Sequence, residues 1–194
     1  KFICGLGTED GKVIERISIP TTTPEETMGK VIEYFSDKEF DVMGVGSFGP
    51  IDPVKGSETY GYITKTPKPY WSDFNMIGEL KEKFNVPMEF DTDVNGAALA
   101  ESWWGAGEGL KNVLYITVGT GIGAGAVVDG KMVQGLTHPE MGHISLKRHK
   151  DDKFEGRCPF HKDCLEGMAA GPAIEDRWGK KGFELAEVDE VWDM

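Results

Sequence analysis

The sequence predicts an α/β fold, in which strands and helices alternate along the chain. Residues 1–6 and 12–19 have the composition of two strands, and Asp10-Gly11 between them suits the positive φ of a tight hairpin turn. Thr23-Pro24-Glu25-Glu26 has the pattern of a helix start, with proline at the first helical position. Apolar runs at 41–48 and 113–118 indicate buried strands that end in glycine-rich turns.

The first helix is predicted over residues 24–36. Its apolar residues recur at the spacing of one helical face: Met28, Val31, Ile32 and Phe35. The strand at 41–48 runs into a Gly-Pro turn, and ligands of α/β proteins often lie beyond such strand ends. Residues 56–71 are rich in Tyr, Thr and Pro and predict a long loop or flap. A functional loop and a plain surface excursion are both open there.

Asp93 falls at the junction of a predicted strand, 86–91, and an alanine-rich helix that reaches about residue 104. A further helix is predicted before this strand, over 75–84. Asp93 is either the N-cap of the alanine-rich helix or a general base that projects into a cleft. Backbone donors at a helix start favour an ionised carboxylate, so one residue can fill both roles.

The predicted strand at 113–118 meets a glycine-rich turn, 119–125, and a returning strand at 126–128. Such a turn can present a row of backbone N–H groups to a phosphate, or it can be a plain glycine hairpin. Its spacing matches neither the Walker motif nor the dinucleotide-binding fingerprint. Two more helices are predicted, at 169–178 and 184–194.

Two histidines and two cysteines gather between Pro139 and Glu166: His143, Cys158, His161 and Cys164. This is a set of imidazole and thiolate ligands that zinc selects, and four protein ligands leave no open position for chemistry. The sequence therefore predicts a structural zinc clasp. Glu140 and Glu166 bracket the ligands, and closing the loop would bring both carboxylates to one patch that can bind a polyol.

A disulfide between Cys158 and Cys164, with two unrelated histidines, is the alternative to zinc. The chain has three cysteines and no visible signal peptide, which favours the reducing cytoplasm and hence zinc. His138 is the weakest candidate ligand and is expected to be a loop residue before Pro139.

The formal net charge of −12 over 194 residues opposes binding to nucleic acid or to an anionic membrane. No apolar run approaches the length of a membrane span. An anionic ligand must therefore be held by local donors.

Four motifs, in order along the chain, carry a family resemblance: D-T-D-V-N-G-A-A-L-A-E, Y-I-T-V-G-T-G-I-G-A-G, H-P-E-M-G-H-I and C-P-F-H-K-D-C-L-E-G. They resemble the ROK family of sugar kinases, repressors and open reading frames. Within that family the chain looks most like the bacterial fructokinases, on G-S-F-G-P-I-D, T-P-K-P-Y-W and the Cys-Pro-aromatic-His segment.

The resemblance implies the actin-like ATPase fold, with two ribonuclease-H-like α/β lobes and a cleft between them. Residues 1–105 would form the first lobe, and residues 106–194 an incomplete second lobe with the zinc loop. It also implies ATP-dependent, Mg²⁺-dependent phosphorylation of a hexose, most closely D-fructose to D-fructose 6-phosphate. A homodimer is expected on the same basis.

Matched motif by motif, Asp93 corresponds to the catalytic base, and Asn95 lies in the same motif as a supporting or substrate-binding residue. The resemblance implies that Glu140, His143 and Glu166 contact the sugar. It implies that the zinc ligands are His143, Cys158, His161 and Cys164. It also implies that the second phosphate-binding loop contains Gly119, Thr120, Gly121 and Gly123.

Some features depart from the family pattern. Many relatives carry C-x-C-G-x-x-G-C where this chain has one histidine and two cysteines, and many carry Asn where it has Thr92. The first phosphate loop is expected upstream of Lys1 and the adenosine-binding part after Met194, so the chain is expected not to turn over alone. The alternatives are a kinase for glucose, mannose or N-acetylmannosamine, a sugar-responsive repressor, and a sugar-binding module without transfer activity.

Overall fold

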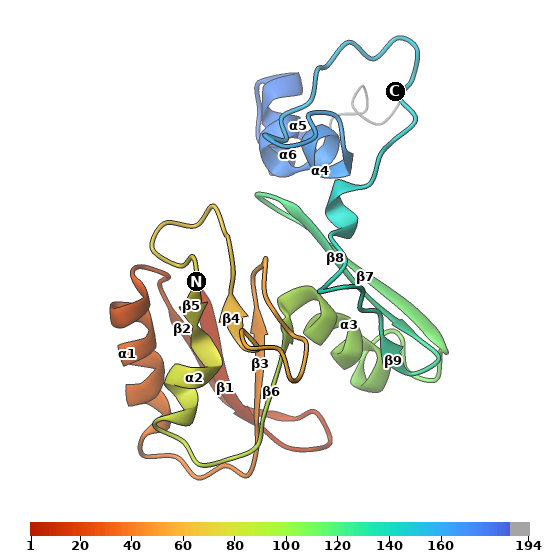
Figure 1. The fold of residues 1–194 in the computed structure, drawn as a ribbon. Helices are drawn as coiled ribbons and strands as arrows, with labels where there is room; N and C mark the ends of the chain where they lie inside the picture. The colour runs from red at the N-terminus through yellow and green to blue at the C-terminus, as the bar shows by residue number, and fades with distance from the viewer. Residues whose placement is uncertain (187–194) are drawn as a thin grey trace.

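The structure, a computed structural model, describes residues 1–186 and has the predicted α/β character. β1 (Phe2–Gly7) and β2 (Val13–Ile19) form the predicted antiparallel hairpin, whereas β3 (Met43–Ser47) pairs in parallel with β6 (Met88–Thr92). Figure 1 places the two pairs beside each other in the N-terminal half of the chain.

Helix α1 (Pro24–Phe35) begins as its sequence predicts, because the hydroxyl of Thr23 accepts a hydrogen bond from the backbone N–H of Glu26. Its apolar stripe faces the core, where Met28 and Val31 are 1% and 5% exposed. The same core receives α2 (Met76–Lys81), so both helices pack on the strands of the N-terminal half.

The predicted flap contains β4 (Tyr62–Ile63) and returns through β5 (Phe74–Asn75). Its anchor is Trp71, which is fully buried and whose Nε1–H donates to the carbonyl of Thr22 at 2.8 Å. A buried tryptophan that satisfies its only polar group fixes a loop firmly, since any movement breaks both packing and hydrogen bond.

Helix α3 (Asp93–Trp104) connects the two halves and packs on the antiparallel sheet β7 (Asn112–Val118), β8 (Ile122–Val128) and β9 (Lys131–Met132). The predicted returning strand was too short. The observed strand, β8, starts at Ile122 instead of residue 126. Gly125 lies within this strand and packs closely against α3, where an added Cβ would be 2.2 Å from the carbonyl oxygen of Val94. The glycines there serve close packing, and the turn shrinks to residues 119–121.

The last described elements are short: η1 (Met141–His143), α4 (Leu165–Ala169), α5 (Gly171–Trp178) and α6 (Gly182–Leu185). The helix predicted at 169–178 starts two residues later, at Gly171, since Ala170 is extended and Pro172 lies in the first turn of α5. The helix predicted at 184–194 lies almost wholly outside the described residues.

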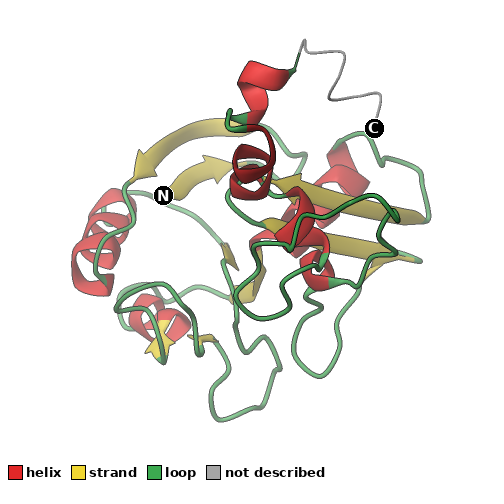
Figure 2. Cartoon of the chain, turned by 90° about the horizontal axis from the view of Figure 1, so that it is seen from above, coloured by secondary structure: helices red, strands yellow, loops and turns green. Residues whose placement is uncertain are grey.

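Figure 2 shows the long loops that connect these short elements. Among residues 1–186, none of the helices combines the length and apolar character that crossing a membrane requires.

Candidate functional site

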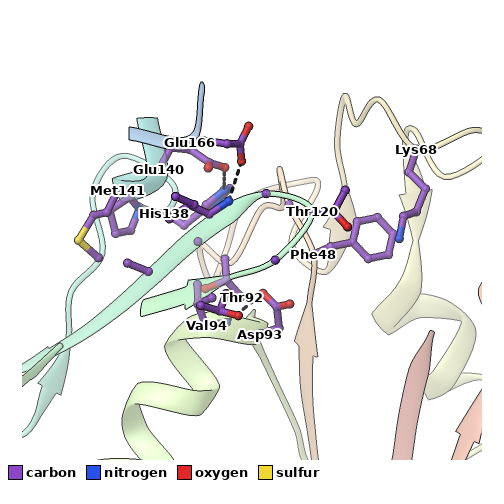
Figure 3. A pocket seen from close by; sticks show the side chains of 18 residues that line it. Phe48, Lys68, Thr92, Asp93, Val94, Thr120, His138, Glu140, Met141 and Glu166 are labelled. Atoms are coloured by element: carbon purple, nitrogen blue, oxygen red, sulfur yellow. Dashed lines mark hydrogen bonds and ion pairs between the residues drawn. The ribbon is translucent and has the colours of Figure 1, made fainter. Parts of the chain in front are cut away.

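A cleft of about 500 Å³ lies where the two halves of the chain meet (Figure 3). Its walls come from the end of β3, the flap, the start of α3, the β7–β8 turn and the segment before η1. Most of the predicted site residues line it: Asp93, Gly119, Thr120, Gly121, Gly123, Glu140 and Glu166. The fold thus brings together motifs that lie far apart in the sequence.

Asp93 is the first residue of α3 and faces the cleft. The N-cap alternative for this residue is wrong, because the N-cap is Thr92, whose Oγ1 accepts from the N–H of Asn95 at 3.2 Å. Asp93 Oδ1 accepts only from the neighbouring N–H of Val94, at 2.9 Å. Its other carboxylate oxygen is therefore available to a ligand in the cleft.

The surroundings of Asp93 raise its pKa above the ordinary value for an aspartate. The main cause is desolvation by the cleft walls, which outweighs the backbone donors at the helix start and the positive charge of Lys68. The backbone donors at the helix start do favour the ionised form, as the sequence predicted, but burial has the larger effect on the pKa. A raised pKa suits a carboxylate that must accept a proton.

Asn95 does not reach the cleft, contrary to its assignment as a substrate-binding residue. It is 0% exposed, and its Nδ2 donates to Asp91 Oδ1 at 2.9 Å and to the carbonyl of Val133 at 3.3 Å. Asp91 Oδ2 in turn accepts from Gln134 Nε2 at 3.0 Å. This buried network ties the start of α3 to the segment after β9 and so holds Asp93 in place.

The β7–β8 turn forms one wall of the cleft, and part of its predicted row of N–H donors is already in use. The N–H of Gly119 donates to the carbonyl of Gly121 at 2.8 Å, and the N–H of Ile122 donates to Glu166 Oε2 at 2.9 Å. Within the described chain, the N–H groups of Thr120 and Gly121 have no protein acceptor. Gly123 belongs to β8 and packs against Val94.

Glu140 is held by His138, a residue that the sequence analysis treated as a plain loop position. His138 Nε2 lies 2.9 Å from Glu140 Oε1, and the imidazole is 4% exposed, whereas the Glu140 side chain is 53% exposed. This hydrogen bond is the main cause that lowers the pKa of Glu140. Gly49 approaches the pair so closely that a Cβ there would be 2.9 Å from His138 Nε2.

The four predicted metal ligands form one cluster, since one ligand atom from each of His143, Cys158, His161 and Cys164 lies within 4.8 Å of the others. His143 Nδ1 is 3.4 Å from Cys164 Sγ and 3.6 Å from Cys158 Sγ. Zinc bonds of about 2.3 Å to sulfur and about 2.0 Å to nitrogen place tetrahedral S and N ligands about 3.5 Å apart. The donor set and its spacing therefore fit a tetrahedral zinc ion.

Both cysteines of the cluster are free thiols and are buried. Burial also raises the pKa of the Cys164 thiol. The backbone brings them together by a tight turn in which Cys158 and Lys162 exchange hydrogen bonds and Lys162 has a φ of 56°. His143 presents Nδ1 to the thiols and Nε2 to Glu166, whose Oε1 is 4.0 Å away. His143 itself does not line the cleft.

Comparison with known proteins agrees with these motifs, since residues 1–191 match the ROK family. The chain belongs to the ROK family. Over 194 residues this ROK chain is 53% identical to a putative fructokinase of Bacillus subtilis, covering all of this chain and 65% of that protein. It is 50% identical over 194 residues to a fructokinase of Pediococcus pentosaceus, covering 67% of that protein.

A solved structure supports the same assignment. The ROK hexokinase from Thermus thermophilus matches with a TM-score of 0.69 and 29% identity, over 87% of this chain and 57% of that one. The ROK chain therefore has the actin-like ATPase fold in part, as its motifs predicted. It spans 65% and 67% of the lengths of the two fructokinase relatives.

Proposed function

We propose that the protein containing this chain is an ATP-dependent, Mg²⁺-dependent sugar kinase that converts D-fructose to D-fructose 6-phosphate. The observation that carries this proposal is the joint presence of Asp93, two carboxylates and the β7–β8 turn in one cleft. The relatives of about 50% identity that bear the name fructokinase support fructose as the sugar.

In this proposal Asp93 is the general base. A sugar hydroxyl oxygen forms a bond to the γ-phosphorus of ATP, and the bond between that phosphorus and the β,γ-bridging oxygen breaks. The electron pair leaves with ADP, and the hydroxyl proton passes to Asp93. Glu140 and Glu166 accept hydrogen bonds from other sugar hydroxyls, and the N–H groups of Thr120 and Gly121 donate to phosphate oxygens. Positioning and charge stabilisation supply most of the rate enhancement in such transfers.

We propose Zn²⁺ as the ion held by His143, Cys158, His161 and Cys164. The donor set fills the tetrahedron with protein ligands, so the ion would stabilise the loop and take no part in phosphoryl transfer. Glu166 lies two residues after Cys164 and faces His143, so the clasp would position this carboxylate toward the sugar.

The organisation of the whole protein is proposed on the same grounds. Two lobes would meet near Gly105, with residues 1–105 in the first and 106–194 in the second, and α3 as the link between them. Free, buried cysteines suit the cytoplasm, where thiols stay reduced. Assembly as a homodimer rests on the family resemblance.

Turnover by the full-length protein tests the proposed function. ADP release is measured with ATP, Mg²⁺ and D-fructose, D-mannose, D-glucose or N-acetylmannosamine. We expect the highest kcat/KM with D-fructose, and a loss of about 10²- to 10⁴-fold in Asp93→Asn. Asp129→Asn, in the exposed β8–β9 turn, is the matched control. Turnover that is highest with another hexose would refute fructose as the substrate, and an active Asp93→Asn would refute the base.

A further inference from the structure

Lys68 occupies an unusual place in this cleft, which is otherwise acidic. Three carboxylates line the cleft, from Asp93, Glu140 and Glu166. Among the described residues that line it, Lys68 is the single lysine or arginine. Figure 3 shows Lys68 across the cleft from Glu140 and Glu166, with Asp93 between the two sides and below them.

Hydrogen bonds within the flap fix the backbone at Lys68. The N–H of Lys68 donates to Thr66 Oγ1 at 3.3 Å, and Ser72 Oγ donates to the carbonyl of Thr66 at 3.0 Å. The flap is anchored by the buried ring of Trp71, which packs against Phe48 with ring centroids 5.7 Å apart. Lys68 therefore extends from a fixed support and not from a free loop end.

The ammonium group of Lys68 rests on an aromatic ring. Its Nζ lies 4.0 Å from the centroid of Phe48, and the described residues include no carboxylate in salt-bridge contact with it. Lys38 and Lys55, by contrast, pair with glutamates at 2.8 Å and 2.7 Å. An aromatic face attracts a cation without neutralising it or using its N–H donors. The charge of Lys68 thus remains available to an anion in the cleft.

Beside the proposed Mg²⁺, a positively charged side chain in the cleft would help to hold a transferred phosphoryl group. The phosphoryl group carries negative charge into a cleft with three carboxylates, and each of these repels it. The turn offers two backbone N–H donors, which are dipoles and carry no net charge. The electrostatic influence of Lys68 already reaches Asp93, the residue closest to the reacting hydroxyl in the proposed mechanism. A lysine at this place would offset the repulsion where charge develops.

We propose that Lys68 is a further catalytic residue, which binds the oxygens of the phosphoryl group during its transfer to the sugar. This proposal rests on the proposed kinase function. It assigns to the flap a part in binding the phosphoryl group. The lysine would act as a point charge, as lysines do toward phosphates in other sites.

Comparing the affinity for the phosphorylated product with that for the unphosphorylated sugar distinguishes a phosphate-binding role of Lys68 from a role in supporting the flap. Dissociation constants for D-fructose 6-phosphate and D-fructose are measured by titration calorimetry on the full-length protein and on Lys68→Met, Lys68→Gln and Lys68→Arg. Lys65→Met is the control, because Lys65 is exposed on the same flap and lies outside the cleft lining. Thermal unfolding checks that each variant is folded, and the glutamine variant serves if the methionine variant is not.

We expect the neutral variants to bind D-fructose 6-phosphate about 10- to 100-fold more weakly while D-fructose binding is unchanged. Their kcat should fall with the phosphate affinity, and Lys68→Arg should keep most of both. Equal losses for sugar and sugar phosphate, or no loss at all, would overturn the proposal and leave Lys68 as a support of the flap. If the parent protein binds neither ligand and phosphorylates no hexose, the proposed function itself is refuted.

Discussion

The contact between His138 and Glu140 allows a sharp test of how the cleft is built. Because His138 uses Nε2, the amide of glutamine reaches the same place, whereas the amide of asparagine ends one carbon short. We therefore expect His138→Gln to retain the contact and His138→Asn to lose it. The two variants differ by one methylene group, so each is the matched control of the other.

The size of the effect follows from the exposure of the two partners. A hydrogen bond to a charged group contributes about 1.5–3 kcal/mol when both partners are buried. Here the glutamate side chain is 53% exposed, so water replaces part of the lost contact. Discounting for this screening leaves about 1 kcal/mol, which is about a fivefold rise in the KM for the sugar in His138→Asn.

The pH dependence has a defined sign. The hydrogen bond from His138 lowers the pKa of Glu140 in the folded protein, so the pair stabilises the fold above the unfolded-state pKa of about 4.3. That contribution is lost as the pH falls through the folded-state pKa. Without the histidine the pKa of Glu140 rises, and the acid limb of the pH profile for sugar binding should move to higher pH.

Steady-state kinetics of the full-length protein check these expectations. The KM for the sugar should rise in His138→Asn while the KM for ATP stays at the parental value. The acid limb is followed from about pH 3 to about pH 6, a range that brackets the ordinary glutamate pKa of about 4.3. If both variants match the parent, or if His138→Gln is as impaired as His138→Asn, Glu140 is not positioned by this contact.

Two further predictions concern the metal cluster and the glycine beside the carboxylate. Cys164→Ser should lose bound zinc and unfold at a lower temperature, whereas Cys4→Ser, at a buried cysteine outside the cluster, should keep its zinc. Metal analysis of the purified proteins measures this, and full zinc content in Cys164→Ser would contradict the assignment. Gly49→Ala should raise the KM for the sugar by about tenfold, since its Cβ would press on the His138–Glu140 pair at a cost of about 1–3 kcal/mol. Gly44→Ala, where an added Cβ meets open space, should not change KM, and equal kinetics of the two variants would argue against the close approach.

Much of the local structure could be predicted from sequence because its causes are local. The capping threonine of α1 and the residue whose N–H it accepts, Glu26, lie within four residues. The candidate metal ligands Cys158, His161 and Cys164 lie within seven. A hydrogen bond or a turn over so few residues depends little on the remainder of the chain. The motif around Asp93 was located for the same reason, at the junction of β6 and α3.

Other assignments failed because residues compete for the same local role. Thr92 and Asp93 are both good N-cap residues, and the sequence alone does not say which of them caps α3. The fold decides for Thr92, because β6 continues through it and turns Asp93 toward the cleft. Asn95 likewise has the chemistry to bind a sugar, but the start of α3 directs it to Asp91 inside the protein.

The sequence by itself determined the order of the elements, the four candidate metal ligands and the identity of the acidic residues around the cleft. Only the tertiary structure decided the surroundings of these residues. Glu166 receives the N–H of Ile122 from 44 positions away, and the Trp71 indole N–H finds its acceptor 49 positions away. The pKa of a carboxylate depends on desolvation and on neighbouring charges, and whether the ammonium group of a lysine is paired depends on the carboxylates near it. In this protein those neighbours come from distant segments, so folding alone sets the chemistry of Asp93 and Lys68.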